Sequence, residues 1–532
     1  MRGPALRILQ INDVYSLEAL PRFATLVKEH TARDPADRTL VVVAGDFLAP
    51  SILSSLDGGR GMVDCLNTIG VTHVTFGNHE DDIHPPELRA RIRELHATWL
   101  GTNVRGFEPR LPLRDVVEVG APGGRTVRVG IVGVVMDDAA VYRGVPFGGA
   151  TLDPPNAAVL CEATALVADG CATIVAMTHQ PIPDDRTLAH AAGAARIAVV
   201  VGGHEHVPFL ETIDGTPIVK TGMDATKAAI IDLVWPAEAP ANGAPDVPRV
   251  TVRLEETSIH AEDPDLRRRV DGHMAQVHLL ETATLMVLAP GETLSSVGVR
   301  SRPASFATLL CSFLRDALAA DACLFNAGGI RASREYVERF TYGDLKAEVP
   351  FDNEIVAVLM AGGVLRDAIA ASRAQSPGES GAYLHADDRV VVDEPSHVVT
   401  AVAGAPLDEG RLYCVAIVRN LLAGMDHIEP LVRFASDPRS VIPPPGSGRD
   451  VKIVLVDAFA HALWRRLGGF DAVDANHDGE VTQSEIAAAV ARLTRAAPSD
   501  VGAALLLNAL DVKHRGAVTR DELRPEDEKP PE

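Results

Sequence analysis

Carboxylate, amide and imidazole side chains recur in the first part of the chain, close to where strands are predicted to end. They lie in five short segments: Asn12-Asp13-Val14-Tyr15, Gly45-Asp46, Gly77-Asn78-His79-Glu80, Thr178-His179-Gln180 and Gly203-His204-Glu205-His206. Such side chains are ligands that suit divalent Mn, Zn or Fe. Two ions held about 3.5–4 Å apart, with one carboxylate bridging them, can hold both the attacking and the leaving oxygen of a phosphoryl displacement. The segments therefore predict a two-metal centre.

Each segment taken alone has a simpler explanation. A single His179 after a strand is more often a structural residue than a ligand, and Asp13 or Asp46 could cap a helix. The Gly77–Glu80 segment is more specific. All five in this order favour the metal centre over coincidence.

The segments follow short runs of β-branched residues that alternate with helical patterns from residue 6 to about 235. These runs are residues 6–11, 39–44, 71–76, 127–134, 172–178 and 196–201. They are apolar on both faces, as buried strands of an α/β domain are. Since open α/β sheets bind ligands just beyond the ends of their strands, we expect each segment on a strand-to-helix turn.

In their types and order the segments resemble those of the calcineurin-like metallophosphoesterases, and within them the 5'-nucleotidase family of the bacterial 5'-nucleotidase and UDP-sugar hydrolase type. The resemblance covers roughly residues 6–222. It implies an α/β fold, a four-layer αββα sandwich with two central sheets. It also implies the following ligands: Asp46 bridging both ions, Asp13 and His206 at one ion, and Asn78, His179 and His204 at the other.

Two more roles follow from the resemblance, and one position departs from it. His79 would lie against the phosphate and Asp82 would orient it, as a carboxylate holds an acid–base histidine. Tyr15 stands where the family carries a histidine. A phenol with a pKa near ~10 is a poor ligand unless a strongly acidic metal deprotonates it. A weaker first site, a site completed by water and a preference for iron are all open.

The resemblance continues to about residue 430. Asn326-Ala327-Gly328-Gly329-Ile330-Arg331 resembles the family's Asn-Gly-Gly-Gly-Ile-Arg, and Val349-Pro350-Phe351 resembles its Leu-Pro-Phe. Guanidinium groups pair with phosphate oxygens, and glycines let the backbone approach a ligand. The substrate residues that the resemblance implies are Arg300, Asn326, Gly328, Gly329, Arg331, Phe351 and Asp426. Arg300 and Arg331 would bind the anionic end, while Phe351 would stack on a flat base.

The alternative makes Phe351 a core residue and both arginines surface charges. A second aromatic residue is also missing, because residues 420–426 contain no ring. Losing one stacking face could remove about 1–3 kcal/mol per base. A nucleoside 5'-monophosphate is the expected substrate, and another phosphomonoester stays open.

Near its C-terminal end the chain carries a calcium-binding pattern, the EF-hand loop. Residues 474–485 place oxygen ligands at the required spacing, with Gly479 at the sharp turn. The ligands are Asp474, Asn476, Asp478, Glu480 through its carbonyl, and Glu485. An acidic turn between two helices is the alternative.

A second loop, residues 511–522, keeps this spacing but has Lys513 and Arg515 at two ligand positions. Because these cations should repel calcium, we expect one calcium per chain. The second loop then serves as a structural partner, with Val518 pairing with Val481.

Composition limits the possible partners. The 532 residues carry a net charge of −22, which argues against nucleic acid, and no apolar run is long enough to span a membrane. The opening residues show no signal-peptide pattern and the six cysteines form no CxxC pair, so we expect reduced thiols and a cytoplasmic location. The predicted domains are residues 1–260 (catalytic), 261–284 (helical linker), 285–450 (α/β, substrate-binding) and 451–532 (a small all-α EF-hand pair with an acidic tail).

The sequence thus predicts a two-metal phosphomonoester hydrolase that uses Mn, Zn, Co or Fe and also binds calcium. Its expected partners are a small phosphoester substrate and calcium, with neither nucleic acid nor membrane. A different class stays open, a calcium-responsive binding or sensor protein whose phosphatase core is inactive. Tyr15 and the missing second ring favour this alternative, whereas the complete remaining ligand set opposes it.

Overall fold

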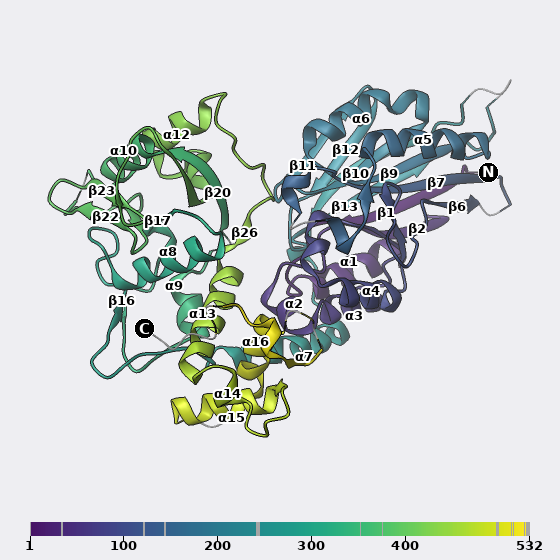
Figure 1. Ribbon diagram of the computed structural model, residues 1–532. Coiled ribbons are helices and arrows are strands. Elements are labelled where there is room, and N and C mark those ends of the chain that lie inside the picture. Colours follow the sequence, from purple (N-terminus) through teal and green to yellow (C-terminus); the bar gives the residue numbers. More distant parts are fainter. Residues whose placement is uncertain are drawn as a thin grey trace. The chain divides into compact units, whose positions relative to one another are not determined.

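The chain forms two compact units, Met1–Ala275 and Gln276–Glu532. The computed structural model describes residues 2–32, 36–120, 123–142, 145–240, 245–351, 353–374, 376–495, 499–511, 513, 515–525 and 527. The boundary between the units falls inside α7 (Pro264–Leu280), the helix predicted as a connector. Figure 1 shows the elements of both units.

Two six-stranded sheets form the centre of the first unit. One has the order β14-β13-β1-β2-β3-β4 and the other the order β11-β12-β10-β9-β7-β6. The first sheet comprises β1 (Ala5–Ile11), β2 (Arg38–Ala44), β3 (His73–Thr75), β4 (Thr98–Leu100), β13 (Lys227–Val234) and β14 (Arg249–Glu256). The second comprises β6 (Arg114–Gly120), β7 (Thr126–Val135), β9 (Thr173–His179), β10 (Ile197–Gly203), β11 (Pro208–Ile213) and β12 (Thr216–Thr221). Strands β1 to β4 are parallel to one another, as are β12, β10, β9 and β7. The antiparallel pairs are β1 with β13, β13 with β14, β11 with β12 and β6 with β7.

Apolar side chains of both sheets meet in one core, which includes Ile8, Val42 and Met177. A second core joins the second sheet to α5 (Pro155–Ala168) and α6 (Ile182–Ala195). The remaining helices, α1 (Leu20–Ala32), α2 (Ile52–Asp57), α3 (Arg60–Ile69) and α4 (Pro85–Glu94), lie on the side of the first sheet (Figure 1). The short strands β5 (Val104–Arg105) and β8 (Thr151–Leu152) pair with each other. This arrangement confirms the predicted αββα sandwich.

The six predicted strands of this unit all form, with bounds shifted by at most a few residues. One expectation was wrong. The segment with His204 and His206 connects β10 to β11, so it lies between two strands and not on a strand-to-helix turn. His179 is itself the last residue of β9.

A mixed sheet of the order β21-β17-β25-β20-β26 organises the second unit. Its strands are β17 (Ala322–Asn326), β20 (Glu354–Ala361), β21 (Leu384–Ala386), β25 (Leu412–Val418) and β26 (Arg449–Asp450), and a smaller sheet contains β22 (Val390–Asp393), β23 (Val398–Val402) and β24 (Ala405–Pro406). The helices are α8 (Ser305–Ala317), α9 (Tyr342–Glu348), α10 (Gly362–Ser372), α11 (Arg419–Leu422) and α12 (Glu429–Ser436). Two short pairs, β15 (Thr284–Val287) with β19 (Arg339–Thr341) and β16 (Leu294–Ser295) with β18 (Glu335–Tyr336), complete the predicted α/β region.

The last segment of this unit has a core of its own, which includes Trp464, Phe470 and Leu506. Its elements are α13 (Val451–Leu467), α14 (Phe470–Val473), α15 (Gln483–Thr494), α16 (Asp500–Leu510), β27 (Val481–Thr482) and β28 (Ala517–Val518). Val481 pairs with Val518 as predicted, so the segment contains a small sheet and is not purely α-helical. The helix before the first loop breaks at Gly468, where φ is 98°. The predicted acidic tail lies largely outside the described residues.

No helix in the described ranges is long and apolar enough to cross a membrane. All six cysteines are free thiols.

Candidate functional site

Three of the predicted metal ligands, Asp13, Asp46 and His179, converge where β1, β2 and β9 end. One ligand atom from each lies within 4.8 Å of the other two, and all three side chains are buried. His179 Nε2 lies 3.0 Å from Asp46 Oδ2. Parallel strands from two sheets thus deliver carboxylates and an imidazole to one point, as expected for open α/β sheets.

The other predicted ligands surround this cluster. His206 Nε2 lies 3.6 Å from Asp13 Oδ1, and the ring of His204 is centred 5.5 Å from that of His179. Asn78 is buried beside His79, whose backbone N–H donates to Asp46 Oδ1 at 2.7 Å. The structure therefore brings all six predicted ligands to one region of the first unit, although their roles as ligands stay predictions.

Unusual backbone conformations accompany this convergence. Asp13, Asp46 and His204 have φ values of 53°, 51° and 90°, in the left-handed region that side chains other than glycine seldom adopt. At Gly45, with φ 79°, an added Cβ would lie 2.4 Å from His179 Nδ1. The close approach of the strand ends therefore requires glycine there.

Glu80 holds the loop that carries Asp46. Its buried carboxylate accepts hydrogen bonds from the backbone N–H groups of residues 46, 47, 48 and 77 at 2.6–3.0 Å. Four donors satisfy a carboxylate that would otherwise be costly to bury. Glu80 belongs to the Gly77–Glu80 motif, but no pattern in the sequence indicates this role.

Burial and neighbouring charges shift the pKa values of the groups in this cluster. Burial raises the pKa of Asp13 to about 7, although the His179 imidazole pulls it down. Burial alone would lower the pKa of His179, but Asp46 and Asp13 outweigh it and raise that pKa to about 9. Burial lowers the pKa of both His204 and His206, which keeps them in the neutral form that binds metals. An ion entering the cluster must displace the His179 proton.

A metal ion fits this donor set. Two carboxylates and three imidazoles face a common region, and His204 Nε2 is buried without a hydrogen-bond partner among the described residues. A buried polar atom of this kind is costly unless something binds it. The cluster is therefore suited to divalent ions.

Tyr15 lies inside the cluster. Its hydroxyl oxygen is 3.0 Å from His206 Nε2 and 3.3 Å from both Asp13 Oδ1 and Asp46 Oδ2. Burial raises the pKa of the phenol well above its ordinary value, and Asp46 adds to this effect. Because this shift favours the protonated hydroxyl, only a strongly acidic ion could bind it as a phenolate.

The predicted catalytic pair is in contact. His79 Nδ1 lies 2.8 Å from Asp82 Oδ2, and both side chains are mostly buried. This contact lets the Asp82 carboxylate orient the His79 ring through Nδ1.

The predicted substrate residues lie in the second unit, around the end of β17. Asn326 Nδ2 donates to Asp426 Oδ2 at 2.7 Å, and Asn326 Oδ1 is buried without a partner in the described chain. Gly328 N–H donates to the carbonyl of Gly381, and Ser380 N–H donates to the carbonyl of Arg300. Gly329 lies in the same turn.

Phe351 is 47% exposed, so it is not a core residue. The guanidinium carbon of Arg331 lies 5.6 Å from the centre of the Phe351 ring. This side chain therefore offers an apolar face to solvent beside a cation, as a base-stacking residue would.

The first predicted calcium loop folds around its own carboxylates. Glu485 accepts from the N–H groups of Ala475 and Thr482, and Asp474 Oδ2 accepts from Gly479 N–H. Asn476 and Asp478 also bond to backbone N–H groups within the loop, and Glu480 is exposed. Asp474 Oδ1 is buried and has no partner among the described atoms.

The second loop contains cations of its own. The Arg515 guanidinium binds Glu522 Oε2 at 2.7 Å, and Lys513 Nζ binds Asp521 Oδ2 at 2.6 Å. These contacts neutralise the carboxylates that would otherwise be available to calcium.

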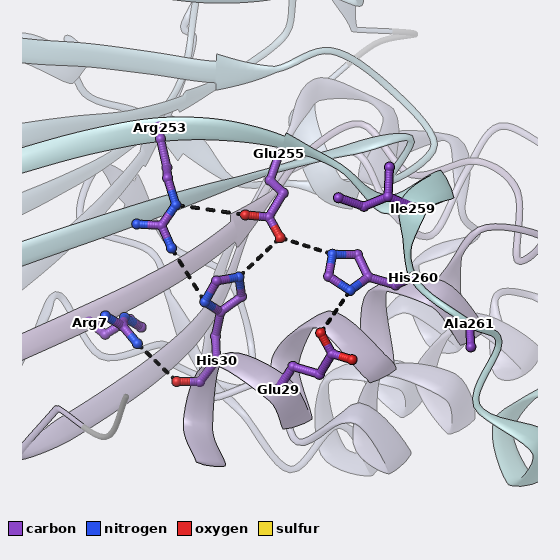
Figure 2. Close-up of a pocket in the computed structure, with 8 residues that line it drawn as sticks. All are labelled: Arg7, Glu29, His30, Arg253, Glu255, Ile259, His260 and Ala261. Carbon is purple, nitrogen blue, oxygen red and sulfur yellow. Dashed lines mark hydrogen bonds and ion pairs between the residues drawn. The ribbon is translucent and has the colours of Figure 1, made fainter. Parts of the chain in front are cut away.

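A cavity of about 630 Å³ opens elsewhere in the first unit, at the end of α1 (Figure 2). The residues that line it are Arg7, Glu29, His30, Arg253, Glu255, Ile259, His260 and Ala261. Glu255 Oε1 lies 3.1 Å from His30 Nε2 and 2.9 Å from His260 Nε2. The charged side chains that line the cavity thus bind one another. None of the predicted site residues is among them.

Two models of known protein families match the chain. The model of the calcineurin-like phosphoesterases matches residues 6–208, and that of the 5'-nucleotidase C-terminal domain matches residues 281–433. Apyrases of Aedes albopictus and Aedes aegypti are 29% and 27% identical to the chain over 188 and 190 residues. Each alignment spans 34% of this chain and 32% of the relative, so the chain covers about a third of the length of these curated relatives.

Solved structures show the same fold. The NAD nucleotidase of Haemophilus influenzae superposes with a TM-score of 0.66 at 15% identity, over 86% of this chain and 96% of that one. A putative 5'-nucleotidase from Staphylococcus aureus gives 0.56 at 16% identity, over 85% and 96%. A 5'-nucleotidase precursor from Thermus thermophilus gives 0.52 at 19% identity, over 86% and 96%.

Proposed function

Because the chain joins a calcineurin-like phosphoesterase domain to a 5'-nucleotidase C-terminal domain, and so belongs to the metal-dependent phosphoesterases of the 5'-nucleotidase family, we propose that it hydrolyses nucleotides with two divalent ions. The observation that carries the proposal is the buried cluster of Asp13, Asp46 and His179. The proposed substrate is a nucleoside 5'-monophosphate, and the products are a nucleoside and phosphate.

Asp46 is the proposed bridge between the ions, since its two oxygens serve different neighbours, His179 and the His79 N–H. One ion would be held by the side chains of Asp46, Asp13 and His206, and the other by those of Asp46, Asn78, His179 and His204. Bound ions of Mn, Zn, Co or Fe would polarise the phosphoryl group and hold its attacking and leaving oxygens.

His79 is the proposed proton donor to the leaving oxygen. Asp82 holds the ring through Nδ1 at 2.8 Å, and Nε2 would face the phosphoryl group. In the second unit, Arg300 and Arg331 would bind the anionic end of the substrate, and Phe351 would stack on its base.

The alternative of an inactive calcium sensor is opposed by the close approach of the predicted ligands. A screen for phosphate release tests the proposal directly. It would compare nucleoside mono-, di- and triphosphates, nucleotide sugars and simple monoesters with Mn, Zn, Co and Fe. Fastest release from a nucleoside monophosphate is expected, whereas a preference for simple monoesters would replace the nucleotide by another phosphomonoester. No release with any metal would favour the sensor.

Replacing Tyr15 with histidine is expected to tighten binding of the first divalent ion. The phenol lies 3.0 Å from His206 and is held protonated, so a neutral imidazole at this position would add a ligand. The variant should then need less added Mn or Zn for full activity. Titration of activity with each metal measures this.

A phenolate ligand would give the opposite outcome. The purified protein would then contain ferric iron and show a visible charge-transfer band, which Tyr15→His would remove. Metal analysis and the visible spectrum of both proteins separate the two cases. A colourless parent with unchanged metal affinity in the variant would exclude Tyr15 as a ligand in either form.

The C-terminal segment supports a second, independent proposal, one calcium ion in the loop of residues 474–485. Two observations favour it: Asp474 Oδ1 is buried with no hydrogen-bond partner among the described residues, and Val481 pairs with Val518. Paired EF-hand loops are joined by such a short sheet, and the unpaired oxygen is suited to a cation.

Glu485→Gln is expected to weaken calcium binding strongly, because it removes the bidentate carboxylate. Glu522→Gln should change binding little, since Arg515 already neutralises Glu522. Calorimetry of both variants tests the assignment. Two equivalent calcium sites in the parent protein would contradict it.

A further inference from the structure

Lys220 is a charged side chain in the interior of the first unit. It lies on β12, and its side chain is 0% exposed. Its Nζ lies 2.8 Å from Asp185 Oδ2, donates to the carbonyl of Gln180 at 2.7 Å and forms an ion pair with Glu205. We refer to Lys220, Asp185 and Glu205 as the Lys220 clasp.

The clasp contacts the segment that carries His179 on both sides of that residue. Asp185 Oδ1 accepts from the Thr178 hydroxyl at 2.7 Å and from Gln180 Nε2 at 3.0 Å. Lys220 adds the bond to the Gln180 carbonyl. The two neighbours of a proposed metal ligand are therefore fixed by one buried ion pair.

The clasp also contacts the segment between β10 and β11. Glu205 stands between His204 and His206, and its Oε1 accepts from Ile182 N–H at 2.8 Å while Oε2 binds Lys220. Both oxygens of Glu205 are therefore held by groups outside the metal cluster, and Glu205 is the residue between the two histidines. The clasp thus fixes the backbone from which both imidazoles project.

A buried ion pair of this kind is weak evidence for a contribution to stability. Burial alone would lower the pKa of the Lys220 ammonium, but Asp185 and Glu205 outweigh it and raise the pKa. Burial in turn raises the pKa of Asp185, although Lys220 opposes this shift. Taking such groups out of water costs about as much as their attraction returns. What the clasp does provide is a fixed geometry between two segments that come from different strands.

We propose that Lys220 is a positioning residue, which holds the segment of His179 against the segment of His204 and His206 so that their imidazoles are in place before an ion binds. This inference rests on the proposed metal centre. Residues that orient metal ligands through hydrogen bonds typically change metal affinity by about 10–100-fold when removed. The ion held by His179 and His204 should be affected most.

Metal affinity and stoichiometry of the folded protein are the decisive readouts. Lys220→Met should lower affinity for one of the two ions by about 10–100-fold, so that metal content falls from two ions per chain towards one. Lys220→Met leaves two carboxylates without their cation and could prevent folding. Glu205→Ala avoids this problem, because the Glu205 side chain is 20% exposed and the ion pair between Lys220 and Asp185 is kept. This variant should weaken binding of the same ion.

Arg7→Met is the matched control. Arg7 is also a buried cation of the first unit, bound to Asp232 at 2.7 Å and to the His30 carbonyl at 2.9 Å, and it lines the cavity in Figure 2. It lies six residues before Asp13 on an extended strand, about 20 Å away. Arg7→Met should lower the unfolding temperature and leave the affinity for both ions unchanged.

The outcomes separate the possibilities. Wild-type affinity for both ions in Glu205→Ala and in folded Lys220→Met would overturn the positioning role, as would equal loss of affinity in Arg7→Met. A parent protein that binds no divalent ion would instead overturn the metal centre itself, and the positioning role with it.

Discussion

Asp46→Asn is expected to abolish phosphate release while leaving the fold largely intact. Asp46 is the proposed bridge, so a single substitution removes a charged ligand from both ions at once. The neutral amide keeps the shape of the side chain, and an oxygen can still accept from the His79 N–H. Turnover and metal content of the purified variant, with circular dichroism to check folding, give the result.

The burial of Asp46 makes the result of this substitution easy to interpret. Asp46 is 1% exposed and contacts His179, and Glu80 holds its backbone N–H, so the substituted side chain should stay in the same position. Retention of more than a small fraction of activity would show that the two-metal assignment is wrong.

His79→Asn is expected to reduce turnover by about 10²–10⁴-fold with little loss of metal. The proposed role of His79 is to stabilise the transition state, and its ring nitrogen Nδ1 is occupied by Asp82. Kinetic constants and metal content measured on the same preparation distinguish this role from that of a ligand.

A second histidine provides the control for this variant. His73 Nε2 lies 3.0 Å from Asp115 Oδ2, in the same unit, but outside the cluster. His73→Asn should leave turnover close to that of the parent. If His79→Asn instead loses metal in step with activity, His79 is a ligand and the catalytic role is lost.

Much of the first unit could be predicted because its strands are encoded in short, continuous runs of the sequence. Runs such as residues 39–44 and 172–178 are apolar on both faces, which only buried strands require, and both are strands in the structure. The ligand segments follow these runs directly, so strand ends in one sheet were expected to bring Asp13 and Asp46 together.

The remaining features depend on contacts between residues far apart in the chain. Lys220 pairs with Asp185, and Glu80 binds backbone groups of residues 46–48, yet neither spacing forms a recognisable pattern. The connection after His204 was predicted as a strand-to-helix turn, because β11 is an edge strand whose alternating exposure gives it no continuous apolar run.

In the second unit the same limit applies to substrate binding. The turn at Asn326 and its bond to Asp426 fit the predicted substrate loop, but residues 326 and 426 are a hundred positions apart. The identity of the base depends on the shape of that loop with a ligand present. By contrast, the pairing of Val481 with Val518 followed from the spacing of the two loops alone.

Addition of a divalent ion to metal-free protein shows whether hydrolysis needs two bound ions. Phosphate release from a nucleoside monophosphate and bound metal per chain are measured in the same samples. We predict that release stays low until the second ion binds and reaches its maximum at two ions per chain. Full release with one ion, or no release at two ions for any phosphoester, would contradict the account.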